Sequence, residues 1–204
     1  MIIKRININD ISEEEYFHAI SIMSDERKLA IGRKKLQSDR NLSIAGEILA
    51  RKCISEVTGH NPDDIAFSRD ENGKPYTTSE DIHFNISHSG EYAVCTASRN
   101  PIGVDVEMIR QVNPDLTKKF CTEKELEYVF SKGNDEKEIC LRLISIWTLK
   151  EAYFKCIGTG ISRDLKVVEF SIRDGAVTCS NTLYTASLDF SADGYIIAVC
   201  EKTK

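Results

Sequence analysis

The sequence contains no C-x-x-C pair, although seven of its 204 residues are cysteines. The absence of that spacing argues against a zinc site, and an odd number of scattered thiols argues against a disulfide framework. We therefore expect the cysteines to serve as small buried apolar side chains. They stand at positions 53, 95, 121, 140, 156, 179 and 200.

A long hydrophobic run is also missing. The first ten residues, Met1 to Asp10, alternate like a β-strand and lack the apolar core of a secretory signal. No later stretch approaches the length needed to cross a bilayer. These absences predict a cytoplasmic protein without a membrane partner. The apolar fraction of 41% and the charged fraction of 29% are typical of a folded globular chain, which argues against disorder.

Positive charge is not in excess, because the formal net charge is −5. This balance argues against a general nucleic-acid partner, which requires a basic surface. A phosphate-binding site in this chain must therefore be locally basic. One basic stretch runs from Asp25 to Arg40, although we expect at least half of its cations to lie on a solvated helix face. Its basic residues are Arg27, Lys28, Arg33, Lys34, Lys35 and Arg40.

Capping and turn residues divide the first half of the chain into helices and strands. Ser12 and Ser24, each followed by acidic residues, predict two helix starts. A longer helix is expected over residues 39–57, ended by Gly59 and Pro62. Short strands separated by turns follow. We predict strands at 65–68, 82–87 and 92–97, and turns at 70–73 and 88–90.

The second half of the chain repeats short stretches of the first half in the same order. Lys52-Cys53-Ile54 recurs as Lys155-Cys156-Ile157 at an offset of 103. Ala93-Val94-Cys95 recurs as Ala198-Val199-Cys200 at an offset of 105. The common order at nearly one offset predicts two copies of a helix-then-strands unit, with a ligand site in the cleft between them.

Carboxylates and valines alternate in the stretch Gly103-Val104-Asp105-Val106-Glu107. In a β-strand this period of two places Asp105 and Glu107 on one face. Acids so close together repel each other unless a cation lies between them. Mg²⁺ prefers oxygen ligands, and one or two carboxylates plus a substrate phosphate would satisfy it. The competing interpretation is a half-solvated edge strand with two exposed acids.

A second stretch places an aromatic ring, an acid and a base along one helical stripe. Trp147, Glu151 and Lys155 are spaced i, i+4, i+8 within a predicted helix. Taken alone, this spacing is more typical of an ordinary glutamate–lysine pair on a solvated surface.

Three segments, taken in order, resemble the signatures of the 4′-phosphopantetheinyl transferases. They are Phe84 to Ser89 (FNISHS), Gly103 to Glu107 (GVDVE) and Trp147 to Lys155 (WTLKEAYFK), and Gly73-Lys74-Pro75 and Gly158-Thr159-Gly160 fit the same pattern. With two similar halves, the chain resembles the surfactin-synthetase-activating (Sfp) type rather than the half-length fatty-acid type, which forms trimers. The resemblance therefore implies a monomer. It covers residues 24–160 strongly and the remainder weakly.

The resemblance implies an α/β (α+β) fold of two similar subdomains, 1–101 and 102–204, related by a pseudo-twofold, with coenzyme A and the metal ion between them. It also implies an enzyme that moves the 4′-phosphopantetheine group of coenzyme A to a serine of an apo acyl or peptidyl carrier protein. The products would be the holo carrier and adenosine 3′,5′-bisphosphate. Catalysis of such phosphoryl transfer depends mainly on positioning and charge neutralisation.

The same resemblance implies roles for individual residues. Asp105, Glu107 and Glu151 would hold Mg²⁺ against the pyrophosphate, and Lys155 would stabilise the leaving phosphate. The base that takes the serine proton would be Glu151, Glu125 or a metal-bound water. The residues implied to contact coenzyme A are Arg27, Arg40, Lys74, Ser87, His88 and Lys155.

The chain departs from the family pattern in its basic residues near the N-terminus. Ala30 stands where a second lysine can occur, and Leu42 replaces an arginine that some members use on the 3′-phosphate. Arg40 is the candidate substitute, although two residues along a helix rotate a side chain by about 200°. Two other functions stay open: a Mg²⁺-dependent hydrolase of a nucleotide diphosphate, and an inert module that binds carrier proteins.

Overall fold

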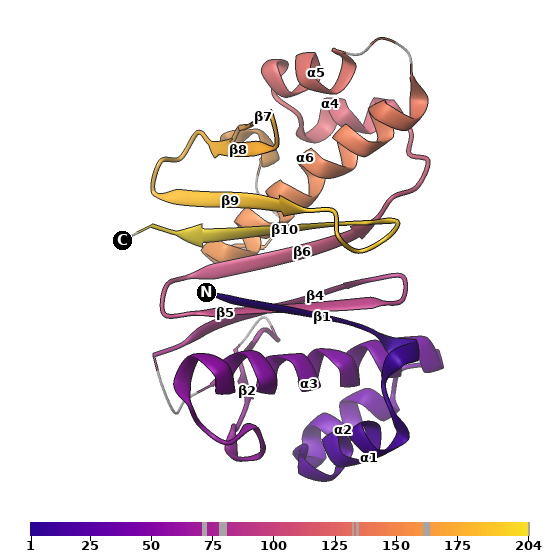
Figure 1. Cartoon of the computed structure of the whole chain (residues 1–204), viewed down its shortest axis with the longest axis vertical. Helices are drawn as coiled ribbons and strands as arrows, with labels where there is room; N and C mark the ends of the chain where they lie inside the picture. The colour runs from indigo at the N-terminus through magenta and orange to yellow at the C-terminus, as the bar shows by residue number, and fades with distance from the viewer. Residues whose placement is uncertain (71–72, 78–80, 132, 134, 161–163, 204) are drawn as a thin grey trace. The chain divides into compact units, whose positions relative to one another are not determined.

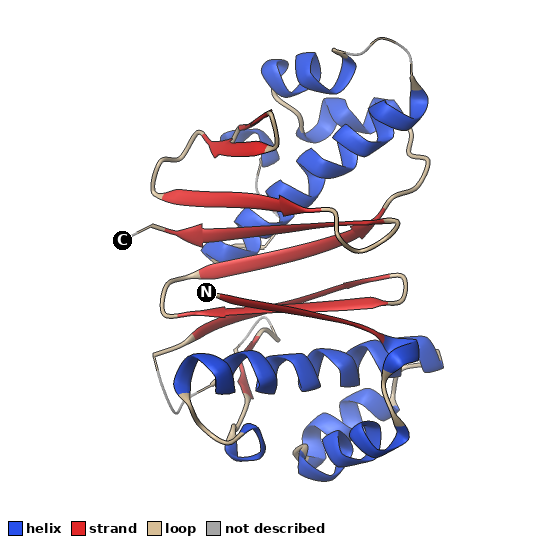
Figure 2. Cartoon of the chain, in the orientation of Figure 1, coloured by secondary structure: helices blue, strands red, loops and turns tan. Residues whose placement is uncertain are grey.

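The computed structural model describes residues 1–70, 73–77, 81–131, 133, 135–160 and 164–203. The chain divides into two units, Met1–Arg99 and Asn100–Lys204 (Figure 1). Each unit combines strands with helices (Figure 2), so the mixed α/β class predicted from the sequence is confirmed. Among the described residues, no helix is both long enough and apolar enough to span a membrane.

Unit 1 packs one long helix, α3 (Gln37–Thr58), across an antiparallel sheet. The sheet order is β1 (Ile2–Asn7), β5 (Tyr92–Ser98), β4 (His83–Ser89). Leu49 and Cys53 of the helix meet Ala93 of the central strand in the core. The shorter elements are α1 (Glu13–Ile22), α2 (Asp25–Gly32), β2 (Ser68–Arg69), β3 (Pro75–Tyr76) and 3₁₀ turns at Ile8–Asp10 and Pro62–Asp64.

Unit 2 is built in the same way around α6 (Glu136–Ile157). Its sheet order is β6 (Ile102–Met108), β10 (Tyr195–Lys202), β9 (Tyr184–Asp189), again antiparallel. Leu149 and Phe154 of α6 and Ile196 of β10 belong to its core. The shorter elements are α4 (Thr117–Phe120), α5 (Glu123–Phe130), β7 (Phe170–Arg173), β8 (Ala176–Cys179) and 3₁₀ turns at Pro114–Leu116 and Leu165–Val167.

The two units repeat one order of elements. In each, a first strand is followed by helices, a two-stranded hairpin and two further strands, and the last strand is central in the sheet. Both long helices have 22 residues and end at a glycine with positive φ, Gly59 or Gly158. Six of the seven cysteines are buried and all seven are free. The thiol of Cys53 donates to the carbonyl of Cys95, and Cys156 interacts with Cys200 at the corresponding place in unit 2.

Most predicted helices and strands are present, but two local predictions are wrong. The strand expected at 65–68 begins only at Ser68, because Ile65 follows a 3₁₀ turn and its carbonyl accepts a hydrogen bond from Arg51 Nη1 at 2.9 Å. The turn expected at 88–90 begins only at Gly90, because β4 continues through His88, which pairs with Ala93. Gly90 has a φ of 56° and supplies the tight hairpin turn.

Candidate active site

Gly103 allows strand β6 to lie directly against helix α6. A Cβ atom at this position would lie 2.1 Å from the carbonyl oxygen of Ala152 and 2.4 Å from the amide nitrogen of Cys156, so only glycine fits. Alternate residues of a strand share a face, and Asp105 and Glu107 therefore also face α6. Hydrogen bonds from α6 to each of these two carboxylates agree with this.

Asp105, Glu151 and Lys155 form a charged cluster at this contact, in which both carboxylates are buried. Lys155 Nζ donates to Asp105 Oδ1 at 2.6 Å. Asp105 is 4% exposed and Glu151 5%, and Glu151 Oε1 has no hydrogen-bond partner among the described residues. Burial raises the pKa of Glu151 to about 7; repulsion from Asp105 adds to this shift, while attraction to Lys155 opposes it. The cluster would therefore bind a further cation favourably.

Glu107 lies two residues beyond Asp105 and is held by the single tryptophan of the chain. Trp147 Nε1 donates to Glu107 Oε1 at 3.0 Å. Burial raises the pKa of Glu107, and the bond from Trp147 opposes that shift. Both side chains line a cavity of about 400 Å³ whose other walls are mainly apolar, with Arg110 and Lys119 as its cations. A carboxylate of the site thus borders an apolar cavity of unit 2.

Glu125, one of the expected bases, is held in a separate ion pair. It is fully buried, and its Oε2 lies 2.9 Å from Lys150 Nζ and accepts from the amide of Thr122 at 2.8 Å. Its Oε1 accepts from the amide of Phe170 at 2.9 Å. The same side chain completes the capping box that starts α5. Because both oxygens are already bonded, we retain Glu151 rather than Glu125 as the candidate base.

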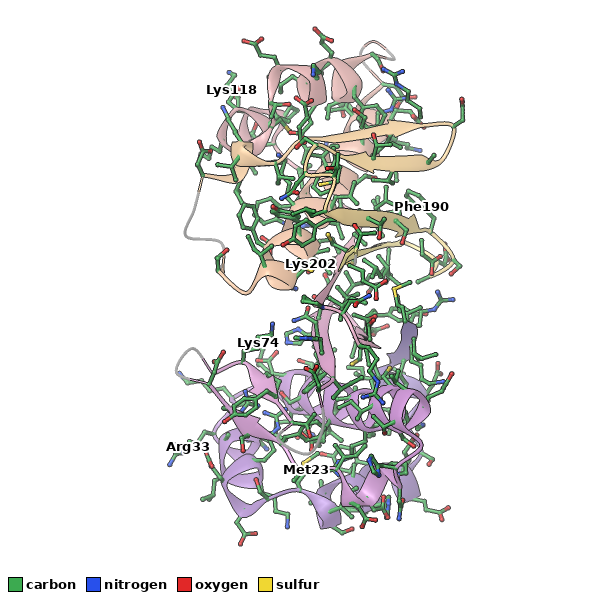
Figure 3. The ribbon with its side chains drawn as sticks, turned by 90° about the vertical axis from the view of Figure 1, so that its left-hand side faces the viewer. Met23, Arg33, Lys74, Lys118, Phe190 and Lys202 are labelled. Atoms are coloured by element: carbon green, nitrogen blue, oxygen red, sulfur yellow. The ribbon has the colours of Figure 1, made fainter. Side chains whose placement is uncertain are left out.

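Apart from Lys155 of α6, the residues expected to contact coenzyme A are distributed over several elements of unit 1. Ser87 and His88 lie on β4, Ser87 being buried. Lys74 follows the turn glycine and precedes β3, and Figure 3 shows its side chain at the tip of that hairpin. Arg27 of α2 donates to Glu47 Oε2 at 3.3 Å and to the carbonyl of Ser43 at 3.1 Å.

Only some of these residues line a common cavity. Arg27 and His88 line one of about 240 Å³, and Leu42 is also in its wall. Arg40 is not among the lining residues; its guanidinium donates to the carbonyls of Lys34 at 2.9 Å and Gly32 at 3.4 Å. Arg40 therefore secures the end of α2.

Lys34 and Arg69 are lining cations that the sequence reasoning did not assign to a site. Lys34 was counted only as one of a group of basic residues. For Arg69 the available signal was its place just before the turn expected at 70–73, of which residues 71 and 72 lie outside the described residues: Arg69 pairs with Pro75, next to the Lys74 of the signature.

The carboxylates of Asp105, Glu107 and Glu151 are suitable ligands for a hard cation, although two of them are bonded to other side chains in this structure. Among the residues that the structure describes, no three His, Cys, Asp or Glu side chains are close enough to hold an ion together. Asp105 is bonded to Lys155 and Glu107 to Trp147. Three neighbouring carboxylates, one with a buried oxygen atom that lacks a bond, are nevertheless the oxygen ligands that Mg²⁺ prefers.

Comparison with known proteins gives matches over almost the whole chain. The model of the 4′-phosphopantetheinyl transferase superfamily matches residues 101–200, and that of the 4′-phosphopantetheinyl transferase N-terminal region matches residues 10–100. The 4′-phosphopantetheinyl transferase gsp of Aneurinibacillus migulanus is 35% identical over 153 residues, which are 75% of this chain and 63% of that protein. The 4′-phosphopantetheinyl transferase Sfp of Bacillus subtilis is 31% identical over 199 residues, 93% of this chain and 87% of that protein.

One solved structure, the holo-[acyl-carrier-protein] synthase of Thermotoga maritima, is similar with a TM-score of 0.43 at 21% identity. The match covers 51% of this chain and 63% of that chain. A likeness of this size is too slight to bear on the assignment.

Proposed function

The chain belongs to the 4′-phosphopantetheinyl transferase family, and from that premise we propose that it transfers the phosphopantetheine group of coenzyme A to a serine of an apo acyl or peptidyl carrier protein. The holo carrier and adenosine 3′,5′-bisphosphate are the products. The observation that carries the assignment to particular residues is the charged cluster of Asp105, Glu151 and Lys155, where β6 meets α6.

In the proposed reaction the serine oxygen attacks the phosphorus that bears the pantetheine arm, and the bond from that phosphorus to the bridging oxygen breaks. Negative charge accumulates on the departing bisphosphate. Lys155 is suited to stabilise it, because its side chain is 28% exposed and its Nζ already binds one anionic oxygen, that of Asp105. A lysine can act in this way as a mobile point charge.

Glu151 is our candidate for the base that takes the serine proton. Burial raises the pKa of Glu151 to about 7, which suits a base, whereas Mg²⁺ held by the same carboxylate would lower its basicity, so the Mg²⁺ dependence of a variant separates the two roles. Glu151→Gln keeps the size of the side chain and removes the base. We expect kcat to fall with this variant even at saturating Mg²⁺; a loss that excess Mg²⁺ restores would assign Glu151 to metal binding alone.

Asp105, Glu107 and Glu151 are the residues that would hold Mg²⁺. When bound, the ion would neutralise the charge of the pyrophosphate and lower the barrier to its cleavage. Support comes from the shared face of Asp105 and Glu107 and from the buried Oε1 of Glu151, for which the described part of the chain offers no hydrogen-bond partner. Lys155 and Trp147 orient two of these carboxylates before any ligand arrives.

We propose that unit 1 binds the nucleotide end of coenzyme A. Arg27 and His88 line its 240 Å³ cavity. Lys74 directly precedes Pro75, which also lines that cavity, and Ser87 lies next to His88 on β4. Support comes from the local excess of basic side chains in a chain whose overall charge is negative.

We further propose that the protein acts as a monomer in the cytoplasm. The repetition of one topology within a single chain favours a monomer, and seven free cysteines suit a reducing compartment. Sedimentation at micromolar concentration tests the first proposal: a dimer or trimer would contradict it. Localisation of the tagged protein in its own cells tests the second, which export from the cytoplasm would contradict.

Incubation of the protein with coenzyme A, Mg²⁺ and an apo carrier tests the proposed reaction. Mass spectrometry should show a carrier heavier by the phosphopantetheine mass, and chelation of Mg²⁺ or substitution of the carrier serine by alanine should abolish the gain. Cleavage of coenzyme A without a mass gain would indicate the hydrolase instead. Carrier binding with neither reaction would indicate the inert module.

A further inference from the structure

Lys155 interacts with all three carboxylates that would hold Mg²⁺. Its Nζ donates to Asp105 Oδ1 at 2.6 Å, and its charge also attracts the carboxylates of Glu107 and Glu151. A single ammonium group therefore acts on the whole set of acids. In the protein without ligands, this lysine supplies part of the positive charge that a bound ion would supply.

The buried acids need a cation even when no ligand is present. Asp105 is 4% exposed and Glu151 5%, and the two carboxylates repel each other. Buried like charges destabilise the folded state unless an opposite charge lies close to them. Lys155 provides that charge from the last turn of α6, where the helix carbonyls also favour a cation.

In this state the acids are arranged around the lysine rather than around an ion. Within the described ranges of the chain, no three His, Cys, Asp or Glu side chains are close enough to share a metal ion. Mg²⁺ requires its oxygen ligands at about 2.0–2.1 Å, and Asp105 Oδ1 already accepts from the ammonium group. Two cations on one carboxylate oxygen repel each other. Binding of Mg²⁺ to Asp105 therefore competes with Lys155.

A diphosphate offers Lys155 another anionic partner. The side chain of Lys155 is 28% exposed, so its ammonium group can exchange one anion for another on the open side of the cluster. A lysine on its flexible stem suits such an exchange, because it acts as a point charge without a fixed fork of donors. When Nζ moves from Asp105 to a phosphate oxygen, Asp105 can bind the ion instead.

We propose that Lys155 is a competing cation: it occupies the carboxylate cluster in the ligand-free protein and leaves Asp105 for the diphosphate when coenzyme A binds. Coenzyme A thereby strengthens Mg²⁺ binding, and Mg²⁺ strengthens coenzyme A binding by the same factor. The proposal rests on the proposed function, because it takes the diphosphate of coenzyme A as the second partner of Lys155. It adds a coupling between metal ion and co-substrate that passes through one side chain.

The test is a Mg²⁺ titration of wild type and Lys155→Met, with and without coenzyme A and always without a carrier. The fluorescence of Trp147 is the readout, because its Nε1 donates to Glu107 Oε1, and calorimetry checks it. Without coenzyme A, Lys155→Met should bind Mg²⁺ about tenfold to a hundredfold more tightly than wild type, within the usual range of coupling between sites. With saturating coenzyme A, the two proteins should agree within about threefold.

Three further variants serve as controls. Lys52→Met removes the same charge from the matching position of α3, where the side chain is exposed and bonded to Glu15, and should leave Mg²⁺ binding unchanged. Lys155→Arg keeps the charge and should keep Mg²⁺ binding weak without coenzyme A. If circular dichroism shows that Lys155→Met does not fold, Lys155→Gln takes its place, since it keeps a hydrogen-bond donor but not the charge.

Two results would overturn the proposal. If Lys155→Met bound Mg²⁺ more tightly by the same factor with and without coenzyme A, the lysine would repel the ion from a fixed position and would not change partners. If Lys155→Met bound Mg²⁺ no more tightly than wild type without coenzyme A, the lysine and the ion would share Asp105 without competing.

These titrations separate failure of this proposal from failure of the proposed function, because they involve no transfer. If the carrier gains no mass but wild type and Lys155→Met differ only without coenzyme A, the proposed function fails and the competition stands. If the carrier gains the phosphopantetheine mass but the two proteins bind Mg²⁺ equally under both conditions, the competition fails and the proposed function stands.

Discussion

The first strands of the two units differ at one matching position, which is apolar in unit 1 and charged in unit 2. Ala93 of β5 and Ala198 of β10 occupy matching positions, and each pairs with a residue of the first strand of its own unit. In unit 1 that residue is Ile6, which packs against the core. In unit 2 it is Asp105, which is 4% exposed. Unit 1 thus places hydrocarbon where unit 2 places a carboxylate.

The long helices differ in the same way. Five positions before the matching cysteines, Cys53 and Cys156, α3 carries Ile48 and α6 carries Glu151, and both residues are 5% exposed. Burying a carboxylate is unfavourable where burying an isoleucine is favourable. Unit 1 therefore shows which residues stabilise this fold, and unit 2 departs from them where the proposed chemistry takes place.

The sharpest test of this difference is to truncate the matching strand residues. Asp105→Ala should reduce transfer by about 10³-fold, since it removes a preorganised charged group of the site, and should leave the protein folded. Ile6→Ala should do the opposite: it removes a half-buried apolar side chain, which destabilises by about 1–2 kcal/mol, and should leave kcat unchanged. Urea unfolding and carrier mass spectrometry measure the two effects. Near-normal turnover of Asp105→Ala at limiting Mg²⁺ would contradict the ligand role.

The buried glutamate of unit 2 should make stability depend on pH. Because the pKa of Glu151 is raised from an ordinary 4.5 to about 7, the folded chain binds this proton more tightly than the unfolded chain does. Its stabilising contribution is therefore complete below about pH 4.5 and lost as the pH rises through about 7, a loss of up to about 3 kcal/mol.

Glu151→Gln removes this titration. Urea unfolding in the presence of a chelator should show the wild type losing stability relative to Glu151→Gln between pH 5 and pH 8. Ile48→Val at the matching position of α3 is the control, and its difference from wild type should not change with pH. If the difference in unfolding free energy between wild type and Glu151→Gln also stayed constant with pH, burial would not raise the pKa of Glu151.

Matching lysines of the two helices should differ in their effect on catalysis. Lys155 is bonded to the buried Asp105, whereas Lys52, at the same place in the repeat, is itself exposed and is bonded to the half-buried Glu15. Lys155→Ala should lower kcat by about 10²-fold, as expected for a group that stabilises the leaving phosphate. Lys52→Ala should leave kcat unchanged. If Lys155→Ala altered only KM, its role would be in binding alone.

Local periodicity explains how much of the site the sequence could predict. The alternation in 103–107 and the helical spacing of Trp147, Glu151 and Lys155 depend only on the periods of a strand and a helix, and both elements are present. The family signatures identified the reaction class. The carrier protein that the enzyme modifies leaves no comparable pattern in the chain.

What the sequence could not predict depends on packing between distant residues. Glu125 looks like a candidate base until the amide of Phe170, 45 positions away, is found to bond it. That Arg69 of the β2–β3 hairpin lines one cavity with Arg27 of α2 and Ser43 of α3 is a property of the folded unit, which no local pattern specifies. Gly103 was recognised as part of a signature, but the requirement for glycine, that a Cβ atom there would lie 2.1 Å from the carbonyl oxygen of Ala152, is a property of the folded unit.

Adding a methyl group to glycines of the two units should sharpen the comparison further. Gly103→Ala forces β6 away from α6, because the new Cβ meets rigid backbone, and should destabilise the protein by about 1–3 kcal/mol. Gly46→Ala in α3 meets only the flexible side chain of Ile86 at 3.0 Å, and alanine favours a helix by up to about 1 kcal/mol. The urea midpoint of Gly103→Ala should therefore be lower than that of Gly46→Ala. Equal destabilisation would show that the close approach at Gly103 is not required.

The smallest effect is expected at the tryptophan that holds Glu107. Trp147→Phe keeps an aromatic ring against Phe120, whose centroid lies 5.2 Å away, but removes the 3.0 Å hydrogen bond to Glu107 Oε1. We expect the Mg²⁺ concentration for half-maximal transfer to rise by about fivefold to tenfold, at the lower end of the effects seen when a partner of a metal ligand is removed, with little change in kcat at saturation. In the wild type, Trp147 is the only tryptophan, so its fluorescence should change on titration with Mg²⁺ at that same concentration. A kcat effect that excess Mg²⁺ does not relieve would mean that Trp147 positions the substrate rather than the carboxylate.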